Sequence, residues 1–224
     1  MMMVGLLPAQ SVREAFYQPY ITGSIDAWQQ VLDRYDAAEM QPAEKYEFAL
    51  GHSGFISFCF GRQQKGRARP YLERAEALAD GLLQGNPEDP RYMALRGALY
   101  GLRMAYQPHK MMSLGPKSQK LVNQALKNDP NCVQALVEFG NMSYHMPEVF
   151  GGSKFKGLAS YEKAISAMEK DPAGIKKNWY YVRINMVLAD WYLTRNRTFA
   201  AHEIYRKMIA MEPGMEEAKQ RLAK

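Results

Sequence analysis

The chain has 224 residues, 47% of them hydrophobic and 23% charged, and this balance excludes an intrinsically disordered protein. Its formal net charge is +6, and residues 113–224 supply the excess with 17 Lys/Arg against 11 Asp/Glu. No stretch approaches the roughly 18 apolar residues that a membrane span needs. The composition therefore predicts a folded globular protein whose basic second half can attract an acidic partner.

Residues 1–9 combine a short apolar run with a possible processing site. Leu7-Pro8-Ala9, followed by Gln10, is similar to a signal-peptidase site, although no basic region precedes the run. The pattern predicts a signal-peptide remnant at 1–9 and a single domain over 10–224. Such a protein is periplasmic or secreted; without export it is cytoplasmic. Cys59 and Cys132 are then either buried free thiols or, in an oxidising compartment, candidates for a disulfide.

Helix signals begin at Ser24, a good N-cap, and continue to the end of the chain. Prolines and glycines divide the pattern, with Pro42 suited to a first helical turn. A basic break at 61–69 and loops at 107–116 and 146–152 separate helices, and no alternation of period two is present. The sequence therefore predicts an all-α protein. The expected helices cover residues 24–35, 42–60, 70–84, 90–106, 117–128, 131–145, 154–170, 176–194 and 198–211, with a short piece after Pro213.

A small residue recurs in the first helix of each successive helix pair: Gly51, Gly97, Gly140 and Ala189. The second helix of each pair carries residues at offsets of 4 and 3, which lie on one helical face. A small side chain at the crossing lets the two backbones approach closely. The second-helix sets are Ala75/Ala79/Leu82/Pro87, Ser118/Val122/Ala125/Pro130, Gly157/Tyr161/Ala164 and Ala201/Tyr205/Met208/Pro213.

This register resembles the tetratricopeptide repeat (TPR) pattern. The resemblance implies a right-handed solenoid of about four helix–turn–helix units, with a capping helix at the N-terminal end. The consensus has 12 positions between the small residue and the first residue of the second-helix set. The fourth unit has 12, whereas the first three have 24, 21 and 17, so insertions cluster at the turns within the units. Departures from the consensus occur at Glu47, Arg96, Ser143 and Asn185.

The segment 146–154, Met-Pro-Glu-Val-Phe-Gly-Gly-Ser-Lys, looks like a turn found in bacterial periplasmic TPR proteins associated with TRAP-type transporters. In that group an Asp usually stands where this chain has Ser153, and both residues can cap a helix. The alternative interpretation is a shaped turn without a ligand role, in which the glycines adopt unusual φ angles.

A TPR solenoid would place the first helix of each unit on a concave face. The mixed polar and aromatic residues expected there suit a peptide segment or a small organic ligand. The alternative is that terminal helices of the chain cover this face. The predicted groove residues are Phe48, His52, Arg91, Asn141, Tyr144, His145, Arg183, Met186 and Asp190.

No spacing in the chain assembles a catalytic or metal site. Nucleotide-binding and nucleophile motifs are absent, and the four histidines are widely separated. The basic stretches at 61–74 and 176–181 are interpreted as a solvated loop and a core-packed helix start, not as a nucleic-acid surface. We therefore expect a non-catalytic scaffold, without a cofactor or metal, that binds a protein or peptide, acidic partners included, in its groove or inserted loops. The alternative is a periplasmic small-ligand-binding subunit associated with a transporter.

Overall fold

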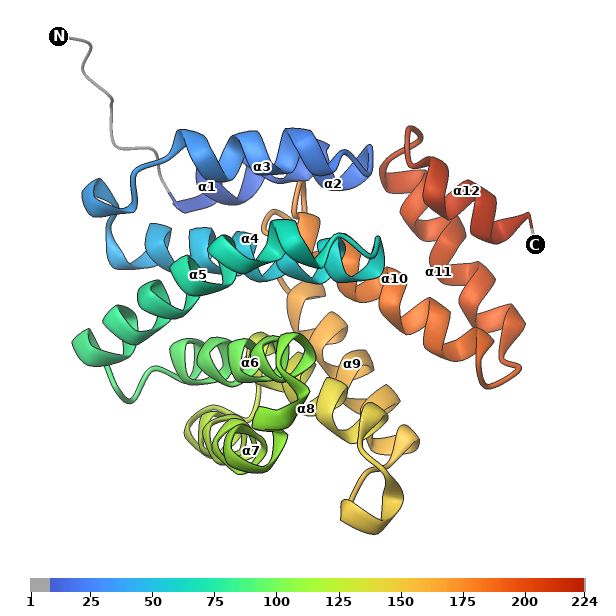
Figure 1. Cartoon of the computed structure of the whole chain (residues 1–224). Coiled ribbons are helices and arrows are strands. Elements are labelled where there is room, and N and C mark those ends of the chain that lie inside the picture. Colours follow the sequence, from blue (N-terminus) through green and yellow to red (C-terminus); the bar gives the residue numbers. More distant parts are fainter. Residues whose placement is uncertain (1–8, 224) are drawn as a thin grey trace, which may run out of the picture.

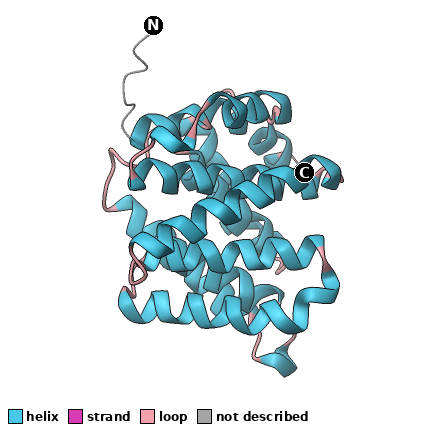
Figure 2. Ribbon diagram, turned by 60° about the vertical axis from the view of Figure 1, so that its left-hand side comes forward, coloured by secondary structure: helices cyan, strands magenta, loops and turns pink. Residues whose placement is uncertain are grey.

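The computed structural model describes residues 9–223, and all its regular secondary structure in that range is helical (Figure 1). Short loops connect the helices, which stack in layers (Figure 2). The α-helices are α1 (Ala9–Ala15), α2 (Tyr17–Ile21), α3 (Ile25–Arg34), α4 (Pro42–Gly61), α5 (Lys65–Gly85), α6 (Pro90–Tyr106), α7 (Met111–Asn128), α8 (Val133–His145), α9 (Lys154–Glu169), α10 (Trp179–Leu193), α11 (Thr198–Met211) and α12 (Glu216–Leu222). Three 3₁₀ turns, η1 (Ala37–Glu39), η2 (Pro108–Lys110) and η3 (Glu148–Phe150), lie in the connections.

The helices pair as the repeat register predicts. Within the described residues α4 packs on α5, α6 on α7, α8 on α9 and α10 on α11, which gives four helix–turn–helix units. The first helices of the first three units form a continuous inner layer, because α6 contacts both α4 and α8. Outside its own unit, helix α10 packs mainly on α9 and on the N-terminal helix α2, and it meets α8 through the stacked rings of Tyr144 and Trp191.

Glycines mark two of the helix crossings as expected. A Cβ atom added to Gly97 would lie 2.7 Å from Val122 Cγ2, and one added to Gly140 would lie 2.6 Å from Tyr161 Cδ2. Both neighbours belong to the second helix of the same unit. Ala189 is fully buried at the corresponding position of the fourth unit.

The prediction that Gly51 marks the crossing of α4 with α5 in the first unit is wrong. A Cβ atom here would collide with the ring of Phe16, which lies between α1 and α2, and not with a residue of α5. The physical reason is that the N-terminal helices pack against α4, so the space left by Gly51 is filled from that side.

Two predicted breaks are shorter than the sequence suggested. Helix α5 already begins at Lys65, and η2 and the start of α7 occupy the expected loop 107–116. Pro70 and Pro116 therefore lie inside helices. A proline there leaves one carbonyl four residues earlier without its helical donor. Those carbonyls belong to Gly66 and Met112, which are exposed, so water can satisfy them.

The N-terminal cap is larger than one helix. Ser24 caps α3 as expected, its hydroxyl accepting a hydrogen bond from the Ala27 amide at 3.2 Å, but α1 and α2 precede it. These helices run across one end of the array, beside the C-terminal helices (Figure 1). The Tyr17 hydroxyl donates to Glu212 Oε2 at 3.3 Å, which joins the two ends of the chain. The predicted processing site lies almost wholly in residues 1–8, outside the described residues, and Ala9 starts α1.

The departures from the TPR consensus have structural partners. Arg13 of α1 donates to Glu47 through Nε at 2.9 Å. Arg96 forms an ion pair with Asp80 at 2.7 Å and lies 3.5 Å from Glu76, both on α5. Asn185 donates through Nδ2 to the Tyr181 carbonyl at 2.9 Å. Glu47, Arg96 and Asn185 thus each have a charged or backbone partner at a position where the consensus has an apolar side chain.

Cys59 and Cys132 are both buried and both free thiols. Burial raises the pKa of the Cys59 thiol to about 11, so it is protonated and unreactive at neutral pH. None of the helices in residues 9–223 is both long enough and apolar enough to span a bilayer.

Candidate functional site

The structure buries part of the predicted groove beneath the N-terminal helices. Phe48 and His52 are 3% and 1% exposed, and Phe48 stacks with Phe16 at a centroid separation of 6.4 Å. Trp28 of α3 meets Trp179 of α10 edge-on at 5.1 Å. These aromatic contacts fill the space between the first and last units, whereas Phe48 and His52 also border a surface depression of about 920 Å³ between α3, α4 and α5.

Four other predicted residues contribute to packing between α8, α10 and the C-terminal helices. Tyr144 stacks face to face on Trp191 at 3.9 Å, and the exposed His145 ring meets the edge of the same indole. Met186 is 4% exposed. Asp190 accepts hydrogen bonds from the Tyr205 hydroxyl at 2.9 Å and from Arg221 of α12 at 2.7 Å.

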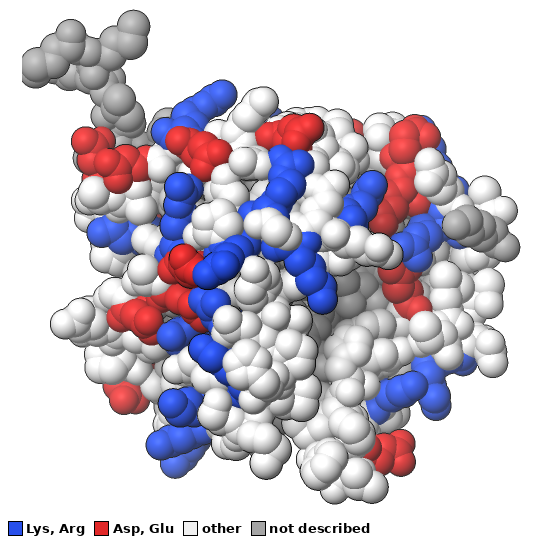
Figure 3. Space-filling view, viewed as in Figure 1, with Lys and Arg blue, Asp and Glu red and all other residues white. Residues whose placement is uncertain are grey.

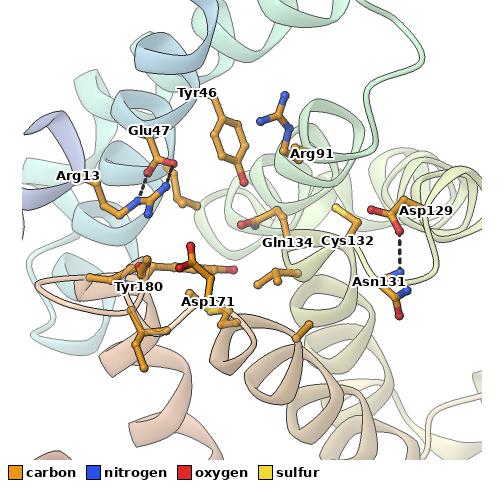
Figure 4. Close-up of a pocket in the computed structure, with 17 residues that line it drawn as sticks. Arg13, Tyr46, Glu47, Arg91, Asp129, Asn131, Cys132, Gln134, Asp171 and Tyr180 are labelled. Carbon is orange, nitrogen blue, oxygen red and sulfur yellow. Dashed lines mark hydrogen bonds and ion pairs between the residues drawn. The ribbon is translucent and has the colours of Figure 1, made fainter. Parts of the chain in front are cut away.

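The remaining three predicted residues, Arg91, Asn141 and Arg183, line two adjoining cavities. Arg91 lies in the larger one, which we call the outer cavity, of about 360 Å³. Figure 4 shows Tyr46 and Gln134 extending into it, between the Arg13–Glu47 pair on one side and Arg91 on the other. Asn141 and Arg183 lie in a smaller cavity of about 160 Å³, the inner chamber. Leu50, Gln134 and Tyr180 line both cavities, so the two cavities adjoin.

All residues that line the inner chamber belong to the first helices of the four units, α4, α6, α8 and α10. Its residues are Leu50, Ser53, Gly54, Ser57, Ala98, Gly101, Leu102, Gln134, Glu138, Asn141, Trp179, Tyr180 and Arg183. The start of α10 is fixed by Asn178, whose Oδ1 accepts from the amides of Tyr180 and Tyr181 at 3.1 Å each. This cap places Trp179, Tyr180 and Arg183 on the first turns of α10.

Glu138 is the centre of the polar side of the chamber. Its Oε1 accepts from Gln134 Nε2 at 2.9 Å and its Oε2 from Asn141 Nδ2 at 3.1 Å. Asn141 in turn accepts from the Tyr161 hydroxyl at 2.7 Å. Burial raises the pKa of Glu138 to about 7, although the Asn141 hydrogen bond and the Arg183 charge oppose this. The chamber therefore holds a carboxyl group that titrates near neutrality.

Three polar atoms of the lining have no partner within the described residues: Gln134 Oε1, Trp179 Nε1 and Tyr180 Oη. The guanidinium of Arg183 also forms no ion pair or hydrogen bond in this part of the chain. Buried polar groups normally find partners, and leaving one unsatisfied costs about 1–3 kcal/mol. Several such groups around one cavity indicate a place for a polar guest.

Of the chamber residues, the predicted groove includes Asn141 and Arg183 but not Gln134, Glu138 or Tyr180. Glu138 lies four residues after Gln134 and three before Asn141, so it shares their face. This spacing of three polar residues was a usable signal.

A second surface runs along the turns within the four units. We call it the turn edge and define it as residues 61–69, 107–120, 146–157 and 194–200. These segments contain eleven Lys/Arg and one Glu, whereas the whole chain has a net charge of only +6. Arg67 and Arg69 form ion pairs with Asp26 and Glu73, and Arg197 lies 3.9 Å from Glu162. The turn edge is therefore strongly basic and only partly neutralised.

The turn edge also carries exposed apolar side chains. Every large hydrophobic residue that is exposed within residues 9–223 lies on it: Met111, Met112, Val149, Phe150, Phe155 and Phe199. Phe150 and Phe155, 73% and 80% exposed, flank the third turn. In Figure 3 the region of η3 and α9, at the bottom of the view, is mostly uncharged, with basic side chains at its margins.

An apolar groove of about 370 Å³ adjoins this edge, and we call it the α8–α9 groove. Two lysines lie at its rim: Lys156, and Lys163, whose Nζ donates to the Pro130 carbonyl at 2.6 Å. The groove is lined by Leu126, Pro130, Leu136, Phe139, Phe155, Lys156, Ala159, Ser160 and Lys163. Ser153 caps α9 at the edge of this groove, accepting from the Lys156 amide at 3.3 Å.

The other charged groups give no sign of a metal centre. Within residues 9–223 no three His, Cys, Asp or Glu side chains gather closely enough to hold an ion. His52 Nδ1 donates to the Phe48 carbonyl at 2.9 Å, and burial lowers the pKa of His52 to about 4. His52 is thus a neutral core residue.

No family model matches the sequence, and no curated protein matches it either. Solved structures do match the fold. TTC0263, a thermophilic TPR protein of Thermus thermophilus, is 17% identical over 96% of this chain and 97% of that one, with a TM-score of 0.54. The HusA haemophore of Porphyromonas gingivalis is 18% identical over 88% of this chain and 97% of that one, with a TM-score of 0.52. The chain therefore has the all-α fold of a TPR-like solenoid.

Proposed function

We propose that this chain is a non-catalytic scaffold that binds an acidic, amphipathic segment of a protein partner at its turn edge. The observation that carries the proposal is the α8–α9 groove, an apolar depression that is lined by the exposed Phe155 and has two lysines at its rim. An apolar side chain of the partner would fill the groove, and flanking carboxylates would meet Lys156 and Lys163. Such a pairing is complementary in shape and in charge.

The concave face supports this role less well. The N-terminal helices cover its first-unit end, and the cavities that remain have the size of a small molecule. The inserted turns, by contrast, expose apolar surface that a soluble monomer normally hides, and such patches mark interaction sites. Of the two locations expected for a partner, the inserted loops are therefore favoured.

A protein segment also fits this surface better than a lipid surface does. Anionic lipids attract basic residues as well, but a flat interface would not need a depression of about 370 Å³ with an apolar floor. The segment 146–154 caps α9 through Ser153 and exposes Phe150 on the turn edge. These two roles support an interpretation of the segment that needs no transporter.

The experiment compares wild type with Phe155→Asp and Lys156→Glu, both exposed changes at the groove. Partners are captured from the native source by cross-linking and are then identified. The binding segment of each partner is synthesised as a peptide and titrated into the protein by calorimetry. We expect each variant to bind the peptide at least tenfold more weakly, and we expect added salt to weaken binding by wild type. Gln84→Asp, an exposed change near the end of α5, is the charge-matched control for Phe155→Asp and should bind like wild type.

Equal binding by wild type and Phe155→Asp would reject the groove. A second contrary outcome combines two observations: the protein sediments with phosphatidylglycerol vesicles, and no captured protein depends on Phe155 for binding. This outcome would show that the turn edge binds lipid, and it would also overturn the proposal.

A small-ligand function is the second candidate, because the inner chamber contains unsatisfied polar groups. HusA, which shares the fold, is described as a haemophore, so this architecture is compatible with a small guest.

A further inference from the structure

The inner chamber lies where the helix stacking of the first three units is not continued in the fourth. The first helices of the first three units pack in sequence, whereas α10 packs on α9 and meets α8 through the stacked rings of Tyr144 and Trp191, near the C-terminal ends of the two helices. The chain explains this difference: from the proline to the next small residue the first two junctions have 10 positions, whereas Pro172 to Ala189 has 17. The longer junction leaves space between α8 and α10, and the chamber occupies it.

The α8 side of the chamber presents acceptors. Glu138 keeps lone pairs on both carboxyl oxygens after accepting from Gln134 and Asn141. Gln134 is 2% exposed, and its Oε1 has no partner because its amide nitrogen is committed to Glu138. A buried acceptor pair with one negative charge suits a cationic group that donates hydrogen bonds, such as an ammonium.

The α10 side presents donors. Arg183 carries a positive charge without an ion pair in the described residues, and it is not joined directly to Glu138. Tyr180 is 4% exposed with an unpartnered hydroxyl, and Trp179 is fully buried with an unpartnered indole N–H. All three residues line the chamber. This side suits a carboxylate, which can accept from a guanidinium fork and from neighbouring hydroxyl or indole donors.

The size of the chamber limits the guest. At about 30 Å³ per water, its volume of about 160 Å³ corresponds to roughly five waters. Leu50, Ala98 and Leu102 form an apolar wall that a small aliphatic side chain would contact. The outer cavity lies beside the chamber, and Leu50, Gln134 and Tyr180 line both.

We propose that the inner chamber binds a small zwitterion of the α-amino-acid class, with its carboxylate at Arg183 and its ammonium at Glu138. A zwitterion bridges the two separated charges and leaves the site neutral. A simple carboxylate would satisfy Arg183 but would place its charge near Glu138. This site uses residues of α8 and α10 that the α8–α9 groove does not include, so either proposal can fail without the other.

The test titrates the full chain with L-alanine, L-valine and L-leucine by calorimetry, with a thermal melt at each saturating concentration. Two analogues of valine separate the charges: isovalerate lacks the ammonium, and isobutylamine lacks the carboxylate. We expect at least one amino acid to bind and to raise the melting temperature. We expect both valine analogues to bind at least tenfold more weakly than valine.

Variants then locate the site. Arg183→Gln and Glu138→Gln remove one charge each, and each should weaken amino-acid binding at least tenfold. Arg206→Gln and Glu203→Gln, an exposed pair on α11, remove the same charges elsewhere and should leave binding unchanged. Far-UV circular dichroism of every variant confirms that it is folded, and Glu138→Gln keeps the side-chain shape if Arg183→Gln does not fold.

Three results would overturn the proposal. Isovalerate binding as tightly as valine, with Glu138→Gln unaffected, would make the chamber an anion site. Unchanged valine binding by both chamber variants would place the amino acid elsewhere. An absence of binding by all three amino acids would leave the chamber as an internal water cavity.

Discussion

At the scale of single residues, His52 shows how the fold sets chemistry that composition cannot. The side chain lies on α4, where its ring meets Phe48 edge-on at 4.6 Å and Tyr71 at 6.0 Å. Burial, with a smaller effect of the nearby Arg74, lowers its pKa to about 4, because the hydrogen bond to the Phe48 carbonyl opposes these effects only in part. A residue predicted to face a groove is thus a neutral part of the core.

This pKa predicts an acid-sensitive stability. The unfolded histidine takes up a proton near its ordinary value of about 6.5, whereas the folded one resists until about pH 4, so stability is lost as pH falls between them. Between pH 7 and pH 5 the loss is about 2 kcal/mol. Urea denaturation of wild type and His52→Gln at both pH values measures it. The wild type should lose about 2 kcal/mol more than the variant, and parallel losses would contradict the assignment.

At the scale of elements, α8 and α9 cross where glycine faces glycine. A Cβ atom on Gly157 would lie 2.8 Å from Tyr144 Cβ and 3.1 Å from the Gly140 carbonyl. Serines of the second helices support two crossings: Ser160 donates to the Leu136 carbonyl at 2.7 Å, and Ser118 donates to the Gly97 carbonyl at 2.8 Å. Close approach and a buried hydrogen bond therefore occur together in these units.

Two identical substitutions should have opposite effects. Gly140→Ala places its methyl group against the ring of Tyr161 and should destabilise the protein by about 1–3 kcal/mol. Gly81→Ala, in α5 where a Cβ atom meets nothing within 4 Å, should stabilise it by about 0.5–1 kcal/mol. Urea denaturation compares both with wild type. A stabilised Gly140→Ala would show that the crossing is not tightly packed.

How well the sequence predicted each element depends on how local its signals are. Pro90 and the aspartate before it define the start of α6, and the predicted bounds 90–106 match the structure, as do 198–211 for α11. Helices α1 and α2 were missed because their stability depends on contacts with α4 and α10, which no local pattern encodes. Tyr180 was missed for a similar reason, since the position of α10 is a tertiary effect, whereas Glu138 had a local signal in its spacing from Gln134 and Asn141.

At the scale of the whole molecule, aromatic side chains connect the two ends of the array. Trp28 lies within 5.9 Å of Phe16, 6.0 Å of Tyr20 and 5.1 Å of Trp179, measured between ring centroids. It is 1% exposed. The N-terminal helices are thus a structural part of the fourth unit as well as of the first.

Removal of this side chain should destabilise the whole molecule. We expect Trp28→Ala to lower the free energy of unfolding by about 3–5 kcal/mol, because it empties a buried space between α3, α4 and α10. Gln30→Ala, an exposed change on the same helix, should stay within about 0.5 kcal/mol of wild type. Thermal melts followed by circular dichroism make the comparison. A Trp28→Ala variant as stable as Gln30→Ala would mean that the ends are not coupled.

The contact of Tyr17 with Glu212, together with Trp28 against Trp179, leaves neither terminus of the solenoid unsupported. Linear repeat arrays fray from their outer repeats, since each repeat depends only on its immediate neighbours. Here the first and last repeats are neighbours of each other through α1–α3. Loss of either terminal repeat would therefore remove support from the opposite one, and unravelling from one side cannot proceed without melting both.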